Sequence, residues 1–177
     1  MTHSTTAKSV LAAALSVVAP MVATGASIHK ELIVDASPAD VWDAMRDYGE
    51  VHKRLAHGFV VDCRLDGDAR IVTFANGSVA REVLVSMDDQ THRLVYTIVG
   101  TRLKHHNASF QIFAEGDNRT RVVWIADILP NDLAPYISGQ MDEGARAMKQ
   151  TLESHGRQSP KTARQPWAPW AMIGAWT

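Results

Sequence analysis

Residues 37–45 read SPADVWDAM, and this stretch predicts a short, capped amphipathic helix. Ser37 suits the N-cap because its hydroxyl can accept a backbone hydrogen bond, and Pro38 suits the first helical position. The acidic side chain of Asp40 is favourable in the first turn. The apolar side chains around this stretch share one face and are expected to be buried: Val41, Trp42, Met45 and Tyr48.

The elements on both sides of this helix set the fold. A strand is predicted before it, and from Phe59 onward the hydrophobic period drops to two, which predicts six more strands. After Pro130 a helix continues to about Glu153 with one apolar face. This order predicts an α+β fold in which a curved antiparallel sheet wraps around one long C-terminal helix and leaves a cavity between them. The predicted strands are 28–35, 59–65, 69–74, 78–87, 93–99, 106–114 and 120–129.

Length and composition exclude several classes of protein. The 177 residues, 46% of them hydrophobic, suffice for one domain with a sizeable core and are too few to expect two. Eighteen basic and nineteen acidic residues give a net charge of -1 without a basic block, so nucleic acid is not an expected partner. The lone Cys63 excludes an intramolecular disulfide framework and a multi-cysteine metal site.

The N-terminal segment 1–26 is apolar, small and nearly uncharged, with one lysine before its apolar run. This pattern predicts a signal peptide, and therefore export to the periplasm or outside the cell. The alternative is a cytoplasmic protein whose N-terminal helix packs on the domain. The run falls short of the roughly 20 apolar residues that span a bilayer, so no stable membrane span is expected.

The ligand-binding domain is predicted at 27–155, and the segment 156–177 follows it as a tail rich in proline and tryptophan. The spacing of its prolines argues against regular structure and favours a mobile tail. The alternative is a segment that folds back over the mouth of the cavity or docks on a partner, including a second copy of the chain in a homodimer.

Several stretches of the chain resemble the START-like, Bet v 1-like helix-grip superfamily (SRPBCC), especially its polyketide cyclase/dehydrase and lipid-transport branch. The resemblance runs from Ile28 to Glu153 and implies the helix-grip fold with an internal cavity. Similar proteins include aromatases, cyclases, dehydratases, hormone receptors and carriers, so the resemblance implies no single activity. The matching stretches are 36–42 with Asp47-Tyr48, Arg81-Glu82-Val83, Leu94-Val95-Tyr96, 120–124 and the closing helix.

The alternation of side chains along the strands indicates which polar groups face the cavity and could take part in acid/base chemistry. Tyr96 and His106 face inward if the apolar face is the concave one, whereas the strand at 78–87 fits either parity. The resemblance favours Glu82 as the inward residue, since similar ligand-binding proteins carry an inward glutamate there. Glu82 and His106 are therefore the candidate acid/base pair, with Tyr96 as a hydrogen-bond donor. The alternative is that Glu82 pairs with an inward arginine or merely hydrates the cavity.

Further side chains are expected to shape the ligand site. No metal is expected, because His105 and His106 point to opposite faces of their strand and His52 and His57 lack the spacing of a helical metal pair. His52 instead lies on a loop or short helix that could gate the cavity. The predicted ligand-binding residues are Trp42, Tyr48, His52, Arg81, Phe110, Trp124, Met141, Ala145 and Met148.

Two functional hypotheses follow. In the first, the cavity binds a small hydrophobic or aromatic carbonyl compound and performs a lyase, cyclase or dehydratase step without a cofactor, with Glu82 and His106 exchanging the proton. In the second, the protein is a carrier or sensor that holds a hydrophobic ligand unchanged.

Overall fold

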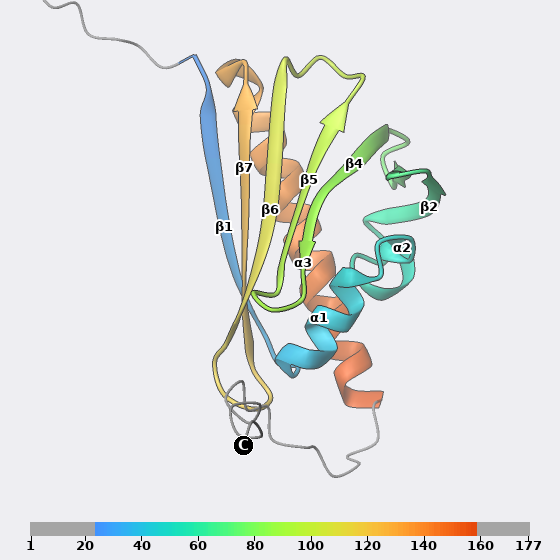
Figure 1. Cartoon of the computed structure of the whole chain (residues 1–177), viewed down its shortest axis with the longest axis vertical. Helices are drawn as coiled ribbons and strands as arrows, with labels where there is room; N and C mark the ends of the chain where they lie inside the picture. The colour runs from blue at the N-terminus through green and yellow to red at the C-terminus, as the bar shows by residue number, and fades with distance from the viewer. Residues whose placement is uncertain (1–23, 159–177) are drawn as a thin grey trace, which may run out of the picture.

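The computed structural model describes residues 24–158, and most of the predicted leader and of the predicted tail lie outside this range. Its seven strands form one antiparallel sheet in the order β1-β7-β6-β5-β4-β3-β2 (Figure 1). The strands are β1 (Ala26–Val34), β2 (Val60–Asp66), β3 (Ala69–Phe74), β4 (Val79–Asp88), β5 (Arg93–Val99), β6 (His105–Ala114) and β7 (Thr120–Leu129). The helices are α1 (Pro38–Arg46), α2 (Val51–Arg54), the 3₁₀ helix η1 (Asn131–Leu133) and α3 (Ala134–Gln158).

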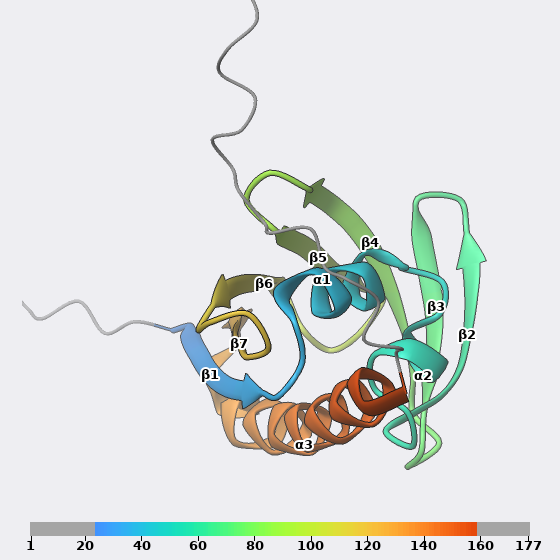
Figure 2. The ribbon, with the colours of Figure 1, turned by 90° about the horizontal axis from the view of Figure 1, so that it is seen from below.

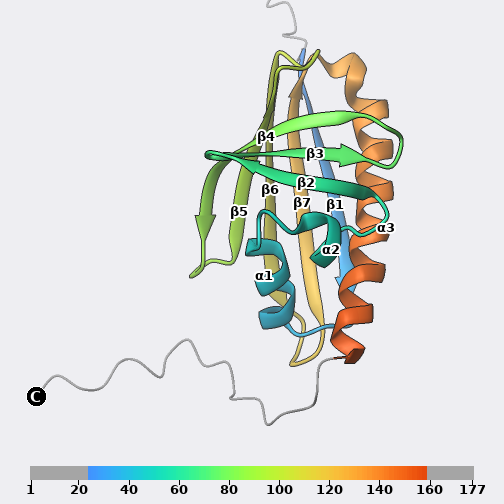
Figure 3. The ribbon, with the colours of Figure 1, turned by 90° about the vertical axis from the view of Figure 1, so that its right-hand side faces the viewer.

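The predicted α+β fold is confirmed. The sheet curves from β1 around to β2, and α3 lies along the open side between these two edge strands (Figure 2). The short helices α1 and α2 sit at one end of the interior, near the C-terminal half of α3 (Figure 3). The interior is therefore closed at that end by helices and bounded elsewhere by the sheet and α3.

Local sequence explains why α1 begins where it does. The backbone N–H of Asp40 donates to the Ser37 hydroxyl oxygen over 3.2 Å, and the Ser37 hydroxyl donates to an Asp40 carboxylate oxygen over 2.6 Å. Ser37 is thus the N-cap and Pro38 the first helical residue, as the sequence predicts.

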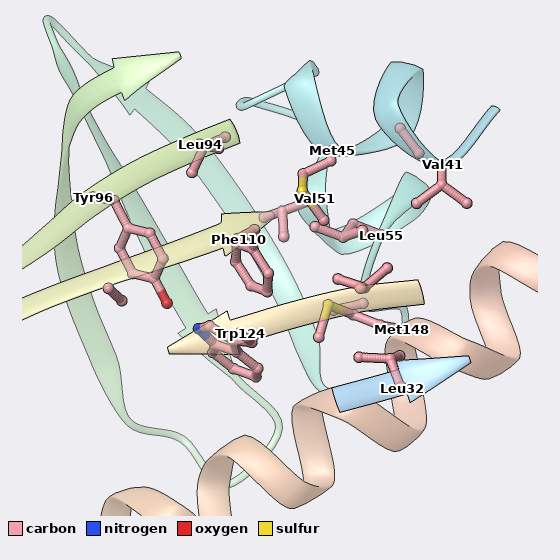
Figure 4. Close-up of a cluster of buried hydrophobic side chains, with 14 of the residues drawn as sticks. Leu32, Val41, Met45, Val51, Leu55, Leu94, Tyr96, Phe110, Trp124 and Met148 are labelled. Atoms are coloured by element: carbon pink, nitrogen blue, oxygen red, sulfur yellow. The ribbon is translucent and has the colours of Figure 1, made fainter. Parts of the chain in front are cut away.

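The core fills the end of the interior beneath α1 and α2. Apolar side chains from these helices meet side chains from the sheet and from the C-terminal half of α3 (Figure 4). Met45 and Met148 are nearly inaccessible to solvent. The core residues labelled there include Leu32, Val41, Met45, Val51, Leu55, Leu94 and Met148. Packing at this end leaves the other end of the interior free to form a cavity.

Within residues 24–158, no helix is both long enough and apolar enough to cross a membrane.

Candidate functional site

A cavity of about 730 Å³ lies between the sheet and α3. Its lining is mainly apolar and comes from strands β2 to β7, the region of α2, the loop between β5 and β6, and α3 as far as Met148. This volume falls within the range of pockets that enclose small organic molecules. Polar side chains in the lining therefore decide what kind of molecule fits.

A buried ion pair is the most polar feature of the lining. Arg70 on β3 donates from Nε and from a terminal nitrogen to one oxygen of Glu82 on β4, both over 2.7 Å. Each of the two side chains is 6% exposed. Burial works to lower the pKa of Arg70, but Glu82, Tyr48 and Tyr96 together outweigh this effect and the pKa is raised. Arg70 therefore remains a cation, and the pair carries no net charge.

Tyr48 contacts both residues of this ion pair. Its hydroxyl donates to the backbone carbonyl of Glu82 over 3.1 Å, and its own carbonyl accepts from Arg70 over 3.0 Å. The guanidinium carbon of Arg70 lies 4.0 Å from the centre of the Tyr48 ring, in cation–π range. Burial raises the pKa of Tyr48. Tyr48 fixes the direction of Arg70 and is not itself part of the cavity lining.

His106 on β6 is held as a neutral ring. The backbone N–H of Ile98 donates to its Nδ1 over 3.1 Å, so the proton of the neutral imidazole sits on Nε2. Burial lowers the pKa of His106 to about 4, and His105 adds to this effect. At neutral pH His106 is therefore a hydrogen-bond donor through Nε2.

The sheet itself creates this arrangement. The register between β5 and β6 runs only as far as the Tyr96–Ala108 pair. Beyond it, the Ile98 N–H bonds to the side chain of His106, and the Thr97 hydroxyl donates to the His106 carbonyl over 2.5 Å. Side chains thus replace ladder hydrogen bonds where the two strands separate along the cavity.

Three aromatic rings from adjacent strands form a stacked row beside the cavity. The centre of the Phe110 ring lies 6.1 Å from that of Tyr96 and 4.8 Å from that of Trp124. The ring of His106 lies 5.7 Å from Tyr96. The Tyr96 hydroxyl and the Trp124 indole nitrogen point toward one another (Figure 4). Burial raises the pKa of Tyr96 and the nearby Glu82 carboxylate raises it further, so its hydroxyl keeps its proton.

The structure brings seven of the predicted site residues into the cavity lining. The two parities left open for β4 are resolved, because Ala80 and Glu82 face the interior and the intervening Arg81 faces outward. The predicted acid/base candidates Glu82 and His106 line the same cavity, as does Tyr96. The other four are Phe110, Trp124, Met141 and Met148.

The other predicted ligand residues lie outside this lining. Arg81 is on the outer face of the sheet, where its Nε lies 3.2 Å from an Asp66 carboxylate oxygen. The indole nitrogen of Trp42 donates to Asp89 over 2.8 Å and ties α1 to the turn after β4. Ala145 and His52, like Tyr48, are absent from the lining. Their placement therefore does not support contact with a ligand in this cavity.

Arg70 is the functional residue that the sequence analysis did not name. The alternation along β3 contains the signal, since Arg70 shares its parity with the inward Val72 and Phe74. It matches the alternative in which Glu82 pairs with an inward arginine. Among residues 24–158, no three histidine, cysteine or acidic side chains are grouped so that they could hold a metal ion.

Comparisons with known proteins agree with this architecture. A family model described as polyketide cyclase / dehydrase and lipid transport matches residues 25–153. No curated protein sequence matches the chain.

Three solved structures show the same fold. The protein XoxI from Bacillus cereus is 18% identical, with a TM-score of 0.62 over 72% of this chain and 95% of that one. Norcoclaurine synthase from Thalictrum flavum is 18% identical, with a TM-score of 0.61 over 76% and 99%. A START superfamily protein from Mycobacterium smegmatis is 12% identical, with a TM-score of 0.59 over 75% and 97%. The chain belongs to the polyketide cyclase/dehydrase and lipid-transport family and has the helix-grip fold of these structures.

Proposed function

We propose that this protein binds a small, uncharged, largely apolar or aromatic molecule in the cavity and carries or senses it without changing it. The observation that carries the proposal is an apolar cavity of about 730 Å³ whose buried ionised side chains, Arg70 and Glu82, neutralise each other. His106 is also uncharged at neutral pH, because its pKa is lowered to about 4. Arg102, which also contributes to the lining, is exposed to solvent.

An uncharged ligand fits because the interior offers no unpaired charge deep inside. A carboxylate or ammonium group would lose its hydration on entry and gain no free counter-ion. Apolar ligand atoms, in contrast, gain about 25 cal/mol for each Å² that leaves water.

A carrier is favoured over a catalyst because both candidate proton acceptors are already engaged. One oxygen of Glu82 accepts from Nε and from a terminal nitrogen of Arg70. His106 already has a proton on Nε2, and its Nδ1 is occupied by the Ile98 N–H. Neither group is arranged as a free general base.

A fluorescent probe tests the binding function. 1-Aminoanthracene is apolar and uncharged at neutral pH, and its emission rises on leaving water. Replacement of Ile137 on α3 by tryptophan narrows the cavity, whereas Gln150→Trp adds the same side chain at an exposed position of the same helix. We expect Ile137→Trp to weaken probe binding at least tenfold and Gln150→Trp to leave it unchanged. Equal binding by all three proteins would rule out this cavity as the site.

A second candidate is a cofactor-free lyase or cyclase, and one observation favours it. Among the described residues, the second carboxylate oxygen of Glu82 receives no hydrogen bond, so it is available to a ligand in the cavity. Norcoclaurine synthase, which shares the fold, has been solved with dopamine and hydroxybenzaldehyde, and the latter is an aromatic carbonyl compound. Glu82→Gln separates the candidates: a catalyst loses turnover of its bound ligand and still binds it, whereas a carrier changes only in affinity.

A further inference from the structure

Trp124 has an unpaired hydrogen-bond donor inside the protein. Its side chain is 9% exposed, and its indole nitrogen is buried without a hydrogen-bond partner among the described residues. Buried donors are nearly always satisfied in native proteins, because an unpaired one keeps the cost of leaving water. Packing alone therefore does not explain why this indole N–H is buried without an acceptor.

The indole cannot turn to find another partner, because it is held on two sides. The Phe110 ring stacks on it with 4.8 Å between centres and 27° between planes. From α3, Gly144 approaches so closely that a β-carbon there would lie 3.1 Å from the Trp124 ring. A side chain at position 144 would press against the indole, so this close approach and the Phe110 stack hold the direction of the N–H.

The fixed N–H points toward the oxygen of Tyr96 (Figure 4). Burial and the Glu82 carboxylate raise the pKa of Tyr96, while Arg70 and the Trp124 indole lower it. Tyr96 is 4% exposed and remains protonated at neutral pH. A phenol oxygen that faces a donor on one side directs its own O–H elsewhere. Because Tyr96 lines the cavity, the cavity is where an acceptor for this proton can enter.

We propose that Trp124 orients the Tyr96 hydroxyl so that Tyr96 donates a hydrogen bond to the carbonyl oxygen of the ligand, and that this contact selects ketones or aldehydes over hydrocarbons of the same shape. Tyr96 touches the ligand, and Trp124 is a positioning residue that acts through Tyr96. The inference rests on the proposed function, because it names the ligand class of the same cavity.

The test compares two uncharged probes with the same ring skeleton, 9-fluorenone and fluorene, which differ by one carbonyl group. Isothermal titration calorimetry gives the affinity ratio of ketone to hydrocarbon for each protein. Removal of the donor in Tyr96→Phe should lower this ratio about tenfold and leave the affinity for fluorene almost unchanged. Trp124→Phe should lower the ratio as well, because the Tyr96 hydroxyl loses its orienting neighbour. Phe110→Leu, which removes no polar atom, should change both affinities alike.

An infrared measurement distinguishes a positioning role of Trp124 from a role in packing alone. Hydrogen bonding lowers the stretching frequency of the bound 9-fluorenone carbonyl, and we expect this lowering in the wild type, a smaller one in Trp124→Phe and none in Tyr96→Phe. An unchanged affinity ratio or carbonyl frequency in Tyr96→Phe overturns the inference and leaves the proposed function standing. If neither probe binds the wild type while 1-aminoanthracene does, the carbonyl class is wrong. If none of the three binds, the proposed function itself fails.

Discussion

Replacement of His106 by glutamine should remove a pH dependence of stability that the fold creates. The folded pKa of His106 is about 4, whereas an unfolded histidine titrates near pH 6.5. Between these two pH values, the unfolded chain binds a proton at His106 and the folded chain does not. The contribution of the neutral His106 to the free energy of unfolding is therefore fully present above about pH 6.5 and is lost as the pH falls toward 4.

The magnitude follows from the separation of the two pKa values. One pKa unit corresponds to about 1.4 kcal/mol, so the full loss is on the order of 3 kcal/mol. At pH 5 most of it has occurred, and the wild type should be about 2 kcal/mol less stable than at pH 7.5 through His106 alone. Glutamine does not titrate, and its amide oxygen can still accept from the Ile98 N–H.

Urea unfolding at pH 7.5 and 5.0 measures this difference, because the other histidines are common to both proteins. The wild type should lose about 2 kcal/mol more than His106→Gln between the two pH values. His105→Gln is the matched control, since His105 is the preceding residue on β6 and is exposed. An equal loss in the wild type and His106→Gln would refute the assignment of His106 as a buried neutral ring.

Three further substitutions test the packing around the site. Arg70→Met should cost about 3–5 kcal/mol in urea unfolding, because it leaves the buried Glu82 carboxylate unpaired, and adding Glu82→Gln should recover much of this loss; a double variant no better than the single one would contradict the pairing. Gly144→Ala should lower stability by about 1–3 kcal/mol through contact with Trp124, whereas Gly139→Ala, with open space around it on the same helix, should raise stability by up to about 1 kcal/mol; equal thermal shifts would speak against the close approach. Ser37→Ala should lower the free energy of unfolding in urea by about 1 kcal/mol, because α1 loses its N-cap.

Local patterns predicted the elements well because each signal lies within a few residues. The cap at Ser37 and the inward parity of Tyr96, Phe110 and Trp124 depend only on spacing along the chain, and all of them are found in the structure. The strand β4 was undecided because both of its faces carry apolar side chains. The inward glutamate there was inferred from the family resemblance.

Contacts between distant segments were harder to predict. The pairing of Arg70 with Glu82 depends on the register of β3 against β4, which places these two residues opposite one another. The proton position on His106 depends on an Ile98 N–H left over where β5 and β6 separate. Trp42 was correctly predicted to be buried, but its indole reaches the turn after β4 instead of the cavity.

Native mass spectrometry of the protein purified from its own host would show what the cavity holds. We expect a complex with one small molecule that is released on denaturation, is uncharged, carries a carbonyl oxygen on an apolar skeleton and is returned unchanged after incubation. Ile137→Trp should lose this molecule and Gln150→Trp should keep it. A bound ligand retained by Ile137→Trp would show that the molecule binds elsewhere, and a ligand with a net charge would show that the cavity does not select uncharged molecules.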